Sequence, residues 1–300
     1  MGVLISAVLP ITLVALTGVW VGRAFRLDIK TMTRLNIYAL LPALVLTGVY
    51  GSDLALGITA RIVLGFLLNC AALYGIANAC AYALKLAPET RKSLVATTLL
   101  ANSGNIGLPF ILFSLGEAGL ERAIVYLISS AIFIASVGPI FLKGEGIKAG
   151  LKVTLNLPVF WATIGGIALQ AFTWEVPIAF DRALALLSDA AIPIALLTLG
   201  VQLSRTSLRF GIYEIFAAGL RLWVSPLIAY LIGSAIGLTG LDLAVLVMQS
   251  AMPVAVNTLI WVTEFGGDGD RVAKTIVLST AMSFASLPTV LWLVSRALEI

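Results

Sequence analysis

The 300-residue chain is too apolar for an ordinary soluble protein. Of its residues, 60% are hydrophobic and only 11% are charged, with a mean hydropathy of +1.06, whereas soluble domains carry roughly 25% charged residues. The net charge of +4 comes from basic residues spread over several loops, without the aromatic-interleaved basic patch of a nucleic-acid-binding protein. These values predict an all-α integral membrane protein in contact with a lipid bilayer, with no nucleic-acid partner.

Ten apolar blocks follow one another along the chain. Each is long enough for a helix that crosses the hydrocarbon core, which takes about 20 residues. The blocks, spans 1 to 10 in chain order, lie near residues 3–22, 32–51, 57–84, 92–115, 122–142, 153–173, 179–203, 209–236, 241–263 and 272–297. Because Arg23 and Arg26 follow the first block instead of preceding it, we interpret this block as a retained span and not as a signal peptide.

Basic residues in the connecting loops predict the orientation, since cytoplasmic loops are enriched in Lys and Arg. One side carries fourteen of the 19 basic residues, namely Arg23, Arg26, Lys30, Arg34, Lys85, Arg91, Lys92, Lys143, Lys148, Lys152, Arg205, Arg209, Arg271 and Lys274. The other side carries Arg61, Arg122, Arg182 and Arg296. With ten spans, both termini are therefore expected to face outward from a bacterial inner (plasma) membrane.

The residues that support most enzyme chemistry are absent or isolated. The chain has no histidine, which excludes a histidine proton relay, a histidine-based metal site and a catalytic triad. Cys70 and Cys80 lie on one span, and the acidic residues are not clustered. We therefore expect no enzyme activity, no metal site and no cofactor.

The two halves of the chain share a short pattern. Residues 41–49 in span 2 and residues 192–201 in span 7 each contain a mid-span proline, an apolar run and a Thr/Gly pair. Five spans in each half would also invert the second half relative to the first. Both features fit the plan of secondary transporters, so we expect a 5+5 inverted repeat.

Span 4 contains the run ANSGNIGLP at residues 101–109, which does not suit a continuous helix. Pro109 lacks an N–H donor and would clash with the carbonyl group one turn earlier, and each glycine lowers the helix propensity by about 1 kcal/mol. Backbone groups freed at this depth need protein or a water-lined cavity. We expect the helix to break near residues 103–108 and to restart with Pro109 in its first turn.

Span 9 contains the run QSAMPVAVN at residues 249–257. Here Pro253 is unaccompanied by glycine, so a milder interruption is expected. Two helices broken at equivalent positions of inverted halves would cross near the bilayer midplane, each with the positive end of a half-helix dipole at the crossing. Backbone N–H groups at such ends bind carboxylates, although the half-helix C-termini that meet there favour cations.

A substrate site at this crossing would combine backbone N–H groups with side-chain amides. The expected substrate-binding residues are Asn102, Ser103, Gly104, Asn105, Gly107, Pro109, Gln249, Pro253, Val254 and Asn257. A lone Asn or Pro more often makes a kink or a hydrogen bond between helices. We give this structural role to Asn36, Asn69, Asn78 and Gln202.

The two interrupted spans resemble the signature of the auxin efflux carrier family. The resemblance rests on NSGNIGLP at residues 102–109 and on AMPVAVNTL at 251–259 with GGD at 266–268, and it extends over the whole chain, including LTLGVQL at 197–203. The chain is similar to the short bacterial members, relatives of malate and malonate carriers, because residues 143–152 leave room for only a brief connector.

The resemblance implies ten spans in a fold like that of sodium/proton antiporters and bile-acid symporters. Spans 1–2 (residues 1–55) and 6–7 (146–206) would form a scaffold. Spans 3–5 (56–145) and 8–10 (207–300) would form a transport domain with crossed spans 4 and 9. The resemblance further implies an elevator movement and a small carboxylate, such as malate or malonate, held by the asparagines of span 4. Scaffold spans rich in Leu, Val and Ala are compatible with a homodimer.

Three charged residues inside spans are further candidates, because ionisable groups in a membrane commonly have a function. Asp189, one turn before Pro193, is expected to be deep and is the carboxylate available for carrying a proton or for ion coupling; the alternative is a buried acid bonded to Ser188 or to backbone. For Arg221 we favour a structural ion pair over contact with an anion or snorkelling. Glu214, two turns away on the same face, is expected to lie near water.

Two transport functions fit these features. The leading one is a secondary transporter of small organic anions, with the substrate at the crossing of spans 4 and 9. The alternative is a sodium-coupled organic-anion symporter of the bile-acid type, although the paired aspartates of a sodium/proton antiporter are missing from spans 4 and 5. A channel would differ in showing no saturation, and a membrane-embedded enzyme lacks a nucleophile with its base.

Overall fold

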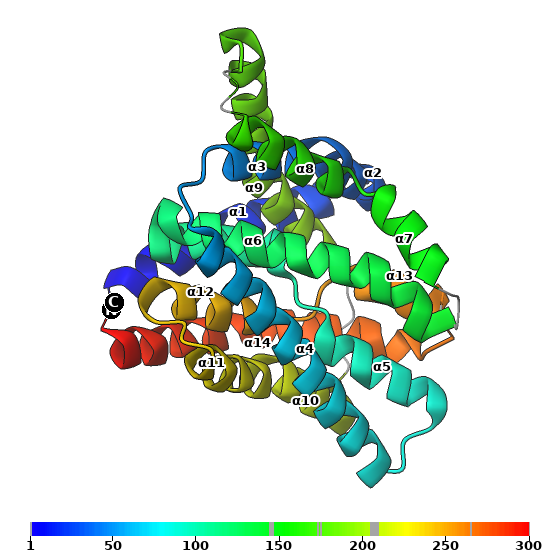
Figure 1. The fold of residues 1–300 in the computed structure, drawn as a ribbon. Helices are drawn as coiled ribbons and strands as arrows, with labels where there is room; N and C mark the ends of the chain where they lie inside the picture. Colours follow the sequence, from blue (N-terminus) through cyan, green and yellow to red (C-terminus); the bar gives the residue numbers. More distant parts are fainter. Residues whose placement is uncertain are drawn as a thin grey trace.

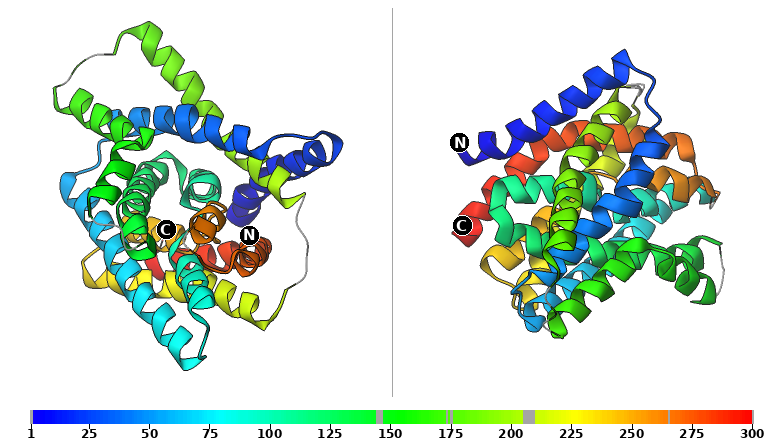
Figure 2. Two further views of the ribbon diagram at one scale, coloured as in Figure 1. Left: turned by 90° about the vertical axis from the view of Figure 1, so that its right-hand side faces the viewer. Right: turned by 90° about the horizontal axis from the view of Figure 1, so that it is seen from above.

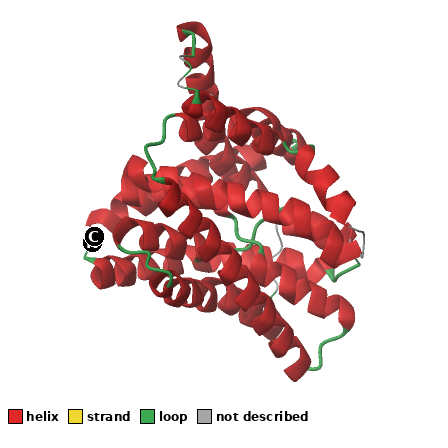
Figure 3. Cartoon of the chain, viewed as in Figure 1, coloured by secondary structure: helices red, strands yellow, loops and turns green. Residues whose placement is uncertain are grey.

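The structure, a computed structural model, describes residues 2–143, 147–172, 174, 176–204, 210–264 and 266–299. Within these ranges the chain is helical, and the one β contact is an isolated bridge between Ala101 and Val254. Figure 3 shows the helices and the loops that join them. The prediction of an all-α chain is confirmed. The side chains of Lys143, Arg205 and Arg209, which entered the orientation prediction, lie outside the described residues.

Six segments of the described chain are long and apolar enough to cross a membrane. They are Ile29–Tyr50, Leu56–Ala83, Ser103–Val137, Ile178–Leu203, Ile212–Ala235 and Gly269–Leu298. Three shorter apolar helices cover Leu9–Ala24, Pro158–Ala171 and Gly240–Ser250. All ten predicted spans overlap with these segments, so the multi-pass character is confirmed, while the count of ten stays a prediction.

The helices are introduced in chain order. The first half contains α1 (Gly2–Ala24), α2 (Ile29–Leu35), the π-helical turn η1 (Asn36–Leu40), α3 (Leu41–Tyr50), α4 (Leu56–Ala83), α5 (Pro88–Leu99), the π-helical turn η2 (Ser103–Gly107) and α6 (Leu108–Lys143). The second half contains α7 (Ile147–Leu155), α8 (Pro158–Ala171), α9 (Ile178–Leu203), α10 (Ile212–Gly219), the π-helical turn η3 (Leu220–Val224), α11 (Ser225–Ala235), α12 (Gly240–Ser250), α13 (Thr258–Glu264) and α14 (Gly269–Leu298).

Local sequence signals explain several helix starts. The carboxylate of Asp28 accepts hydrogen bonds from the N–H groups of Lys30 (3.1 Å) and Thr31 (3.3 Å), which is the role of an N-cap residue. The hydroxyl group of Thr31, together with the N–H of Lys30, holds the pKa of Asp28 below its usual range. Prolines occupy one of the first two positions of α3, α5, α8 and α11, where a missing N–H costs no intrahelical bond.

Span 6 starts later than predicted. Residues 153–155 belong to α7, and Asn156 and Leu157 separate α7 from α8. Pro158 explains this break, because the residue before a proline avoids the helical region, and Leu157 has φ and ψ angles of −80° and 122°. The apolar helix of span 6 is therefore α8, which is 14 residues long.

α6 joins the second half of span 4 to span 5. Gly116 lies inside this helix with φ 72° and ψ −170°, a conformation that glycine adopts without a Cβ penalty. The chain therefore kinks at Gly116, between the end predicted for span 4 and the start predicted for span 5.

The helices form two groups, with α6 between them. In Figure 1, α1, α2, α3, α8 and α9 lie in the upper part of the view, and α4, α5, α10, α11, α12 and α14 lie in the lower part. In the upper group α1 packs against α9, and α3 packs against α8 and α9. In the lower group α4 packs against α5 and α11, and α10 packs against α14. Figure 2 shows both ends of the chain on the same side of the molecule.

The largest buried apolar cluster connects the two groups. It includes Ile11, Leu44 and Leu196 of the upper group, together with Ile111 of α6 and Leu246 of α12. The two groups therefore share one core in this conformation.

α1 and α9 approach each other at glycines. A Cβ atom on Gly200 of α9 would lie 2.8 Å from the Cα of Gly18 and would overlap the carbonyl oxygen of Ala15. A Cβ on Gly18 would likewise overlap the carbonyl oxygen of Leu197. Small residues let membrane helices pack with their backbones in contact, so the separation of α1 and α9 depends on the missing side chains.

Candidate functional site

The two interrupted spans meet through their non-helical segments. α5 ends at Leu99 and α12 ends at Ser250, and the residues that follow each helix are extended or turn-like. The N–H of Asn102 donates to the carbonyl oxygen of Pro253 (2.8 Å), and the N–H of Ala255 donates to that of Leu100 (2.9 Å). These two reciprocal bonds satisfy backbone groups that would otherwise lack partners inside a membrane.

The break in span 4 lies earlier than predicted. Residues 100–102 are non-helical, whereas residues 103–107 form the π-helical turn η2, with the N–H of Gly107 bonded to the carbonyl oxygen of Asn102 (3.1 Å). The reason is the pairing with span 9, which supplies hydrogen bonds only to residues 100 and 102. Helical structure resumes at Ser103 and continues from η2 into α6 (Leu108–Lys143), so the predicted restart with Pro109 in the first turn is too late.

The break in span 9 is longer than that in span 4, so the expectation of a milder interruption is wrong. Residues 251–257 separate α12 from α13. Partners outside the segment compensate for the lost helix: the N–H of Val254 donates to the hydroxyl oxygen of Ser279 on α14 (3.2 Å), and the N–H of Ala255 donates to Leu100. A long unwound segment therefore needs no glycine here.

Two buried amide side chains lie at the crossing with hydrogen-bonding atoms unused. Gln249 is 0% exposed, and no described residue bonds to its Oε1 or Nε2. Asn102 is 5% exposed, and its Nδ2 likewise lacks a described partner. The amide of Gln249 lies against Gly107, where a Cβ would come within 3.0 Å of its Cδ. Buried polar groups are nearly always bonded, so these atoms are candidates for holding a ligand.

Gly104 and Asn105 lie at the boundary with the upper helix group. With Asn36 of η1 and with Ala191 and Ala195 of α9 they line a cavity of about 10 Å³, which is about the room of one water molecule. Asn36 is 6% exposed, and its Oδ1 has no partner within the described part of the chain. The sequence analysis gave Asn36 a structural role. The sequence signal that could have indicated its place at the cavity is its position as a polar residue just before the repeated pattern of span 2.

The remaining expected site residues differ in their exposure. Ser103, Pro109, Pro253 and Val254 are buried around the crossing. Asn257 is exposed and precedes α13, where its carbonyl oxygen accepts the N–H groups of Ile260 and Trp261. The expected set therefore divides into a buried group, the pair that faces α9, and one exposed residue.

Asp189 is exposed on α9, so the alternative of a buried acid bonded to Ser188 is wrong. The hydroxyl group of Ser188 lies instead 3.2 Å from that of Thr47 on α3. Ser188 points into the α3–α9 contact, and the next residue along a helix points to a different side. A role of Asp189 in proton or ion coupling stays a prediction.

Arg221 makes no ion pair with any described carboxylate, so the favoured interpretation of this residue is also wrong. Its guanidinium group instead donates to backbone carbonyl groups near the ends of α5 and α12. The acid two turns away, Glu214, pairs with Arg271 of α14. Sequence spacing put Glu214 and Arg221 on one helix face, but in the structure Glu214 lies in α10 and Arg221 lies in the π-helical turn η3 that follows it.

The comparison with known protein families covers nearly the whole chain. The model of the family described as membrane transport protein matches residues 3–293. The chain belongs to this family of membrane transporters. As a member of a transporter family, it is not an enzyme.

Three relatives illustrate the range of the family. An uncharacterized transporter of Methanothermobacter thermautotrophicus is 29% identical over 272 residues, which are 88% of each chain. A protein of Rhizobium meliloti, provisionally named a malonate transporter, is 26% identical over 207 residues, or 64% of each chain. Auxin efflux carrier component 1 of Arabidopsis thaliana is 28% identical over 137 residues, which are 43% of this chain and 21% of the plant protein. The resemblance to auxin efflux carriers is confirmed.

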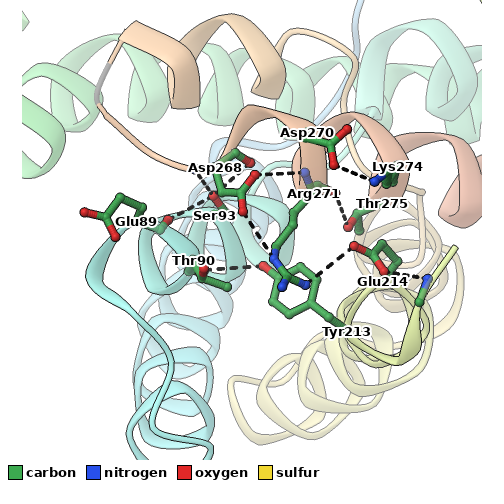
Figure 4. Close-up of polar contacts among 11 residues, drawn as sticks. Glu89, Thr90, Ser93, Tyr213, Glu214, Asp268, Asp270, Arg271, Lys274 and Thr275 are labelled. Carbon is green, nitrogen blue, oxygen red and sulfur yellow. Dashed lines mark hydrogen bonds and ion pairs between the residues drawn. The ribbon is translucent and has the colours of Figure 1, made fainter.

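A charged cluster lies where α5, α10 and α14 of the transporter begin (Figure 4). Arg271 is at its centre, with Nη1 3.7 Å from Glu214 Oε1, Nε 3.2 Å from Asp268 Oδ2, and the guanidinium group 4.6 Å from the Tyr213 ring centre. Glu214 is only 4% exposed, and its Oε2 accepts the N–H of Gly211 (2.7 Å). Glu214 lines an open polar cavity with Asp270 and Lys274, but its carboxylate is buried and is paired with Arg271 and with the N–H of Gly211.

The GGD motif at residues 266–268 has a structural explanation in this cluster. Asp268 caps α14 by accepting the N–H of Arg271 (3.1 Å), and its own N–H donates to the hydroxyl oxygen of Ser93 on α5 (2.8 Å). The motif thus ties the end of span 9 to the start of span 4.

Replacing Asp268 by alanine is expected to lower the melting temperature of the purified transporter, because a lost N-cap costs about 1–2 kcal/mol. The matched control is Asp270→Ala, which removes an exposed ion pair with Lys274 that should contribute roughly 0–1 kcal/mol. Thermal unfolding in detergent, followed by tryptophan fluorescence, measures both. Equal melting temperatures of the two variants would contradict the capping role.

An apolar cavity lies away from the crossing amides, which are absent from its wall. It has a volume of about 330 Å³ and lies between α4, α5, α6 and α13, with Tyr74, Leu100, Phe133 and Trp261 in its wall. Its wall offers almost only apolar atoms. Anion binding needs hydrogen-bond donors or positive charge, so we place the candidate site at the crossing and not in this cavity.

Proposed function

We propose that this transporter carries small organic anions of the carboxylate class, held at the crossing of spans 4 and 9. The observation that supports this most is the pair of buried amides without partners, Asn102 and Gln249, beside the start of η2 and α6. Amide N–H groups and the N-terminal end of a long helix are both donors to a carboxylate. The malonate in the provisional name of the Rhizobium meliloti relative belongs to the same substrate class.

We further propose a 5+5 inverted repeat, with spans 1–2 (1–55) and 6–7 (146–206) as scaffold and spans 3–5 (56–145) and 8–10 (207–300) as transport domain. The packing pattern supports this arrangement: α1 of span 1 packs on α9 of span 7, and α3 of span 2 packs on α8 of span 6. A two-fold relation between the halves exchanges these two contacts. The reciprocal hydrogen bonds at the crossing have the same symmetry.

The site would open by a movement of the transport domain against the scaffold. The cavity between Asn105 and Asn36 holds about one water molecule, which is too little room for a dicarboxylate. Admission of the substrate therefore requires the α9 side and the η2 side to separate. An elevator movement of spans 3–5 and 8–10 is the proposed form of this separation.

Two further parts of the proposal concern the membrane context. Both termini are proposed to face outward, and their position on one side of the molecule is consistent with an even number of spans. Exposed apolar residues on the scaffold helices, such as Leu13 and Trp20 on α1, are compatible with a homodimer.

The test is transport by the purified protein in proteoliposomes. A panel of malate, malonate, succinate, lactate and indole-3-acetate is offered with and without a sodium or pH gradient, with currents recorded on a solid-supported membrane and labelled-anion counterflow covering electroneutral exchange. Saturable, counterflow-competent flux of a carboxylate is expected. Absence of flux for every carboxylate in both assays would contradict the proposal, and strict dependence on sodium would favour the alternative of a sodium-coupled symporter.

Asn105→Ala is expected to reduce carboxylate flux about tenfold, which corresponds to one charge-assisted hydrogen bond of about 1.4 kcal/mol. Asn78→Ala is the matched control, because the bond described for the Asn78 amide stays within its own helix, to the carbonyl oxygen of Tyr74 (2.8 Å). Initial uptake rates at several concentrations measure the apparent affinity and the maximal rate. Unchanged flux in Asn105→Ala would remove this residue from the site.

A further inference from the structure

Among the residues whose side chains are described, Arg221 is the largest that is almost fully buried, with 1% exposure. It lies in η3, the π-helical turn of span 8, and not in either broken span. A charged side chain in the interior of a membrane protein is costly, and it needs partners that compensate for the lost water.

The partners of Arg221 are backbone carbonyl groups from both broken helices. Its Nη1 donates to the carbonyl oxygens of Thr98 (2.7 Å) and Leu99 (3.4 Å), at the C-terminal end of α5. Its Nε donates to Met252 (3.0 Å) and its Nη2 to Ser250, both at the C-terminal end of α12. One guanidinium group therefore joins the two half-helix ends on which negative dipole charge is concentrated.

A second set of hydrogen bonds holds the α12 end in place. The hydroxyl group of Ser250 accepts from the amide of Asn69 (3.2 Å) and lies 3.3 Å from the hydroxyl oxygen of Tyr126. The hydroxyl group of Ser225 donates to the carbonyl oxygen of Ser250 (2.9 Å). These groups are neutral, so among the described residues Arg221 supplies the only full charge in this cluster.

We infer that Arg221 is a built-in cation that occupies the half-helix C-termini in place of a transported cation. In transporters with broken helices, N-terminal half-helix ends face anionic substrates, whereas unwound carbonyl groups and C-terminal ends coordinate sodium or protons. Here the guanidinium group of Arg221 permanently takes the place of the cation at the C-terminal ends. The anion site on the N-terminal side then keeps its positive potential with no ion bound, and transport does not require sodium.

This inference rests on the proposed carboxylate function, and it makes Arg221 a positioning residue that does not touch the substrate. Loss of its charge leaves carbonyl groups of two helices facing each other without a cation. Both half-helices then shift, and a misplacement of about 1 Å at a site can cost about 100-fold in rate.

The experiment compares Arg221→Ala, Arg221→Gln and Arg221→Lys in proteoliposomes, with and without guanidinium chloride or sodium chloride at constant ionic strength. Arg221→Ala is expected to lose about 100-fold in carboxylate flux, with several-fold recovery by guanidinium. Arg221→Lys should retain more flux than Arg221→Gln, because it keeps the charge. The matched control is Arg61→Ala, which removes an exposed arginine that also donates to a backbone carbonyl, that of Gly237 (3.1 Å), and which guanidinium should not affect.

A substrate-free measurement separates this inference from the proposed function and also covers a variant that folds poorly. The melting temperature of Arg221→Ala in detergent is expected to rise with guanidinium, whereas the wild type and Arg61→Ala show no such rise. Failure of carboxylate flux in the wild type together with this selective rise would refute only the substrate class. Equal flux in Arg221→Gln and Arg221→Lys, a sodium requirement of the wild type, or no guanidinium effect on Arg221→Ala would overturn the built-in cation.

Discussion

Gly200→Leu is expected to destabilise the folded transporter strongly. The α1–α9 contact places the backbone of one helix against that of the other, with Gly200 facing Gly18 and the carbonyl oxygen of Ala15. A clash with backbone cannot be relieved by a rotamer change, so α1 would have to move away from α9 along its length. Overpacking in a close-packed core costs about 1–3 kcal/mol and occasionally more, and this backbone contact belongs to the high end of that range.

The measurement is the monodisperse fraction and the melting temperature of Gly200→Leu after purification in detergent. Gly75→Leu on α4 is the control, because a Cβ there meets no atom within 4 Å. Gly18→Leu should reproduce the defect from the opposite side of the contact. A Gly200→Leu protein that melts at the temperature of Gly75→Leu would contradict this account of the α1–α9 contact.

The features that the sequence predicted well are those with local causes. Long apolar blocks determine the helical membrane class, and proline with glycine or asparagine inside such a block identifies an interrupted helix. Pro109 and its neighbouring glycines therefore revealed that span 4 is interrupted, and the two asparagine-containing motifs revealed the family. Each of these signals is complete within a single span of about 20 residues.

The features that the sequence analysis missed depend on contacts between distant segments. The break in span 4 lies at residues 100–102 because its partner, Pro253, is in span 9. Glu214 is buried because Arg271 of another helix covers it. From the sequence, the partner of Arg221 could be an acidic side chain, an anion or water. The structure shows that its partners are backbone carbonyl groups, because the ends of two helices meet around it.

Asn36 shows the same limit within the candidate site. In sequence it is one polar residue in an apolar span, which most often makes a bond between helices. In the structure it lies opposite Gly104 and Asn105 across the small cavity, with its Oδ1 lacking a described partner. Its relation to the crossing depends on the packing of η1 against α9, which no local pattern encodes.

Gly107→Ala is expected to disrupt the candidate site while leaving the fold intact. A Cβ at residue 107 would overlap Oε1 of Gln249 and lie 3.0 Å from its Cδ and 3.1 Å from its Nε2. The clash involves the end of a side chain and not backbone, so the amide can rotate away from η2. The proposed carboxylate then loses one of its buried donors, and flux should fall about tenfold, or about 1.4 kcal/mol.

A double-mutant cycle decides whether Gly107 acts through Gln249, because residues in contact show non-additive effects. Initial rates of carboxylate uptake are measured for Gly107→Ala, Gln249→Ala and the double variant, with Gly75→Ala as a glycine control. If the alanine methyl acts by displacing the amide, Gly107→Ala should lower flux in the wild type and add nothing once residue 249 is alanine. Equal losses in both backgrounds would mean that η2 itself is distorted, and the buried amide of Gln249 would no longer be needed to explain the glycine in the span 4 motif.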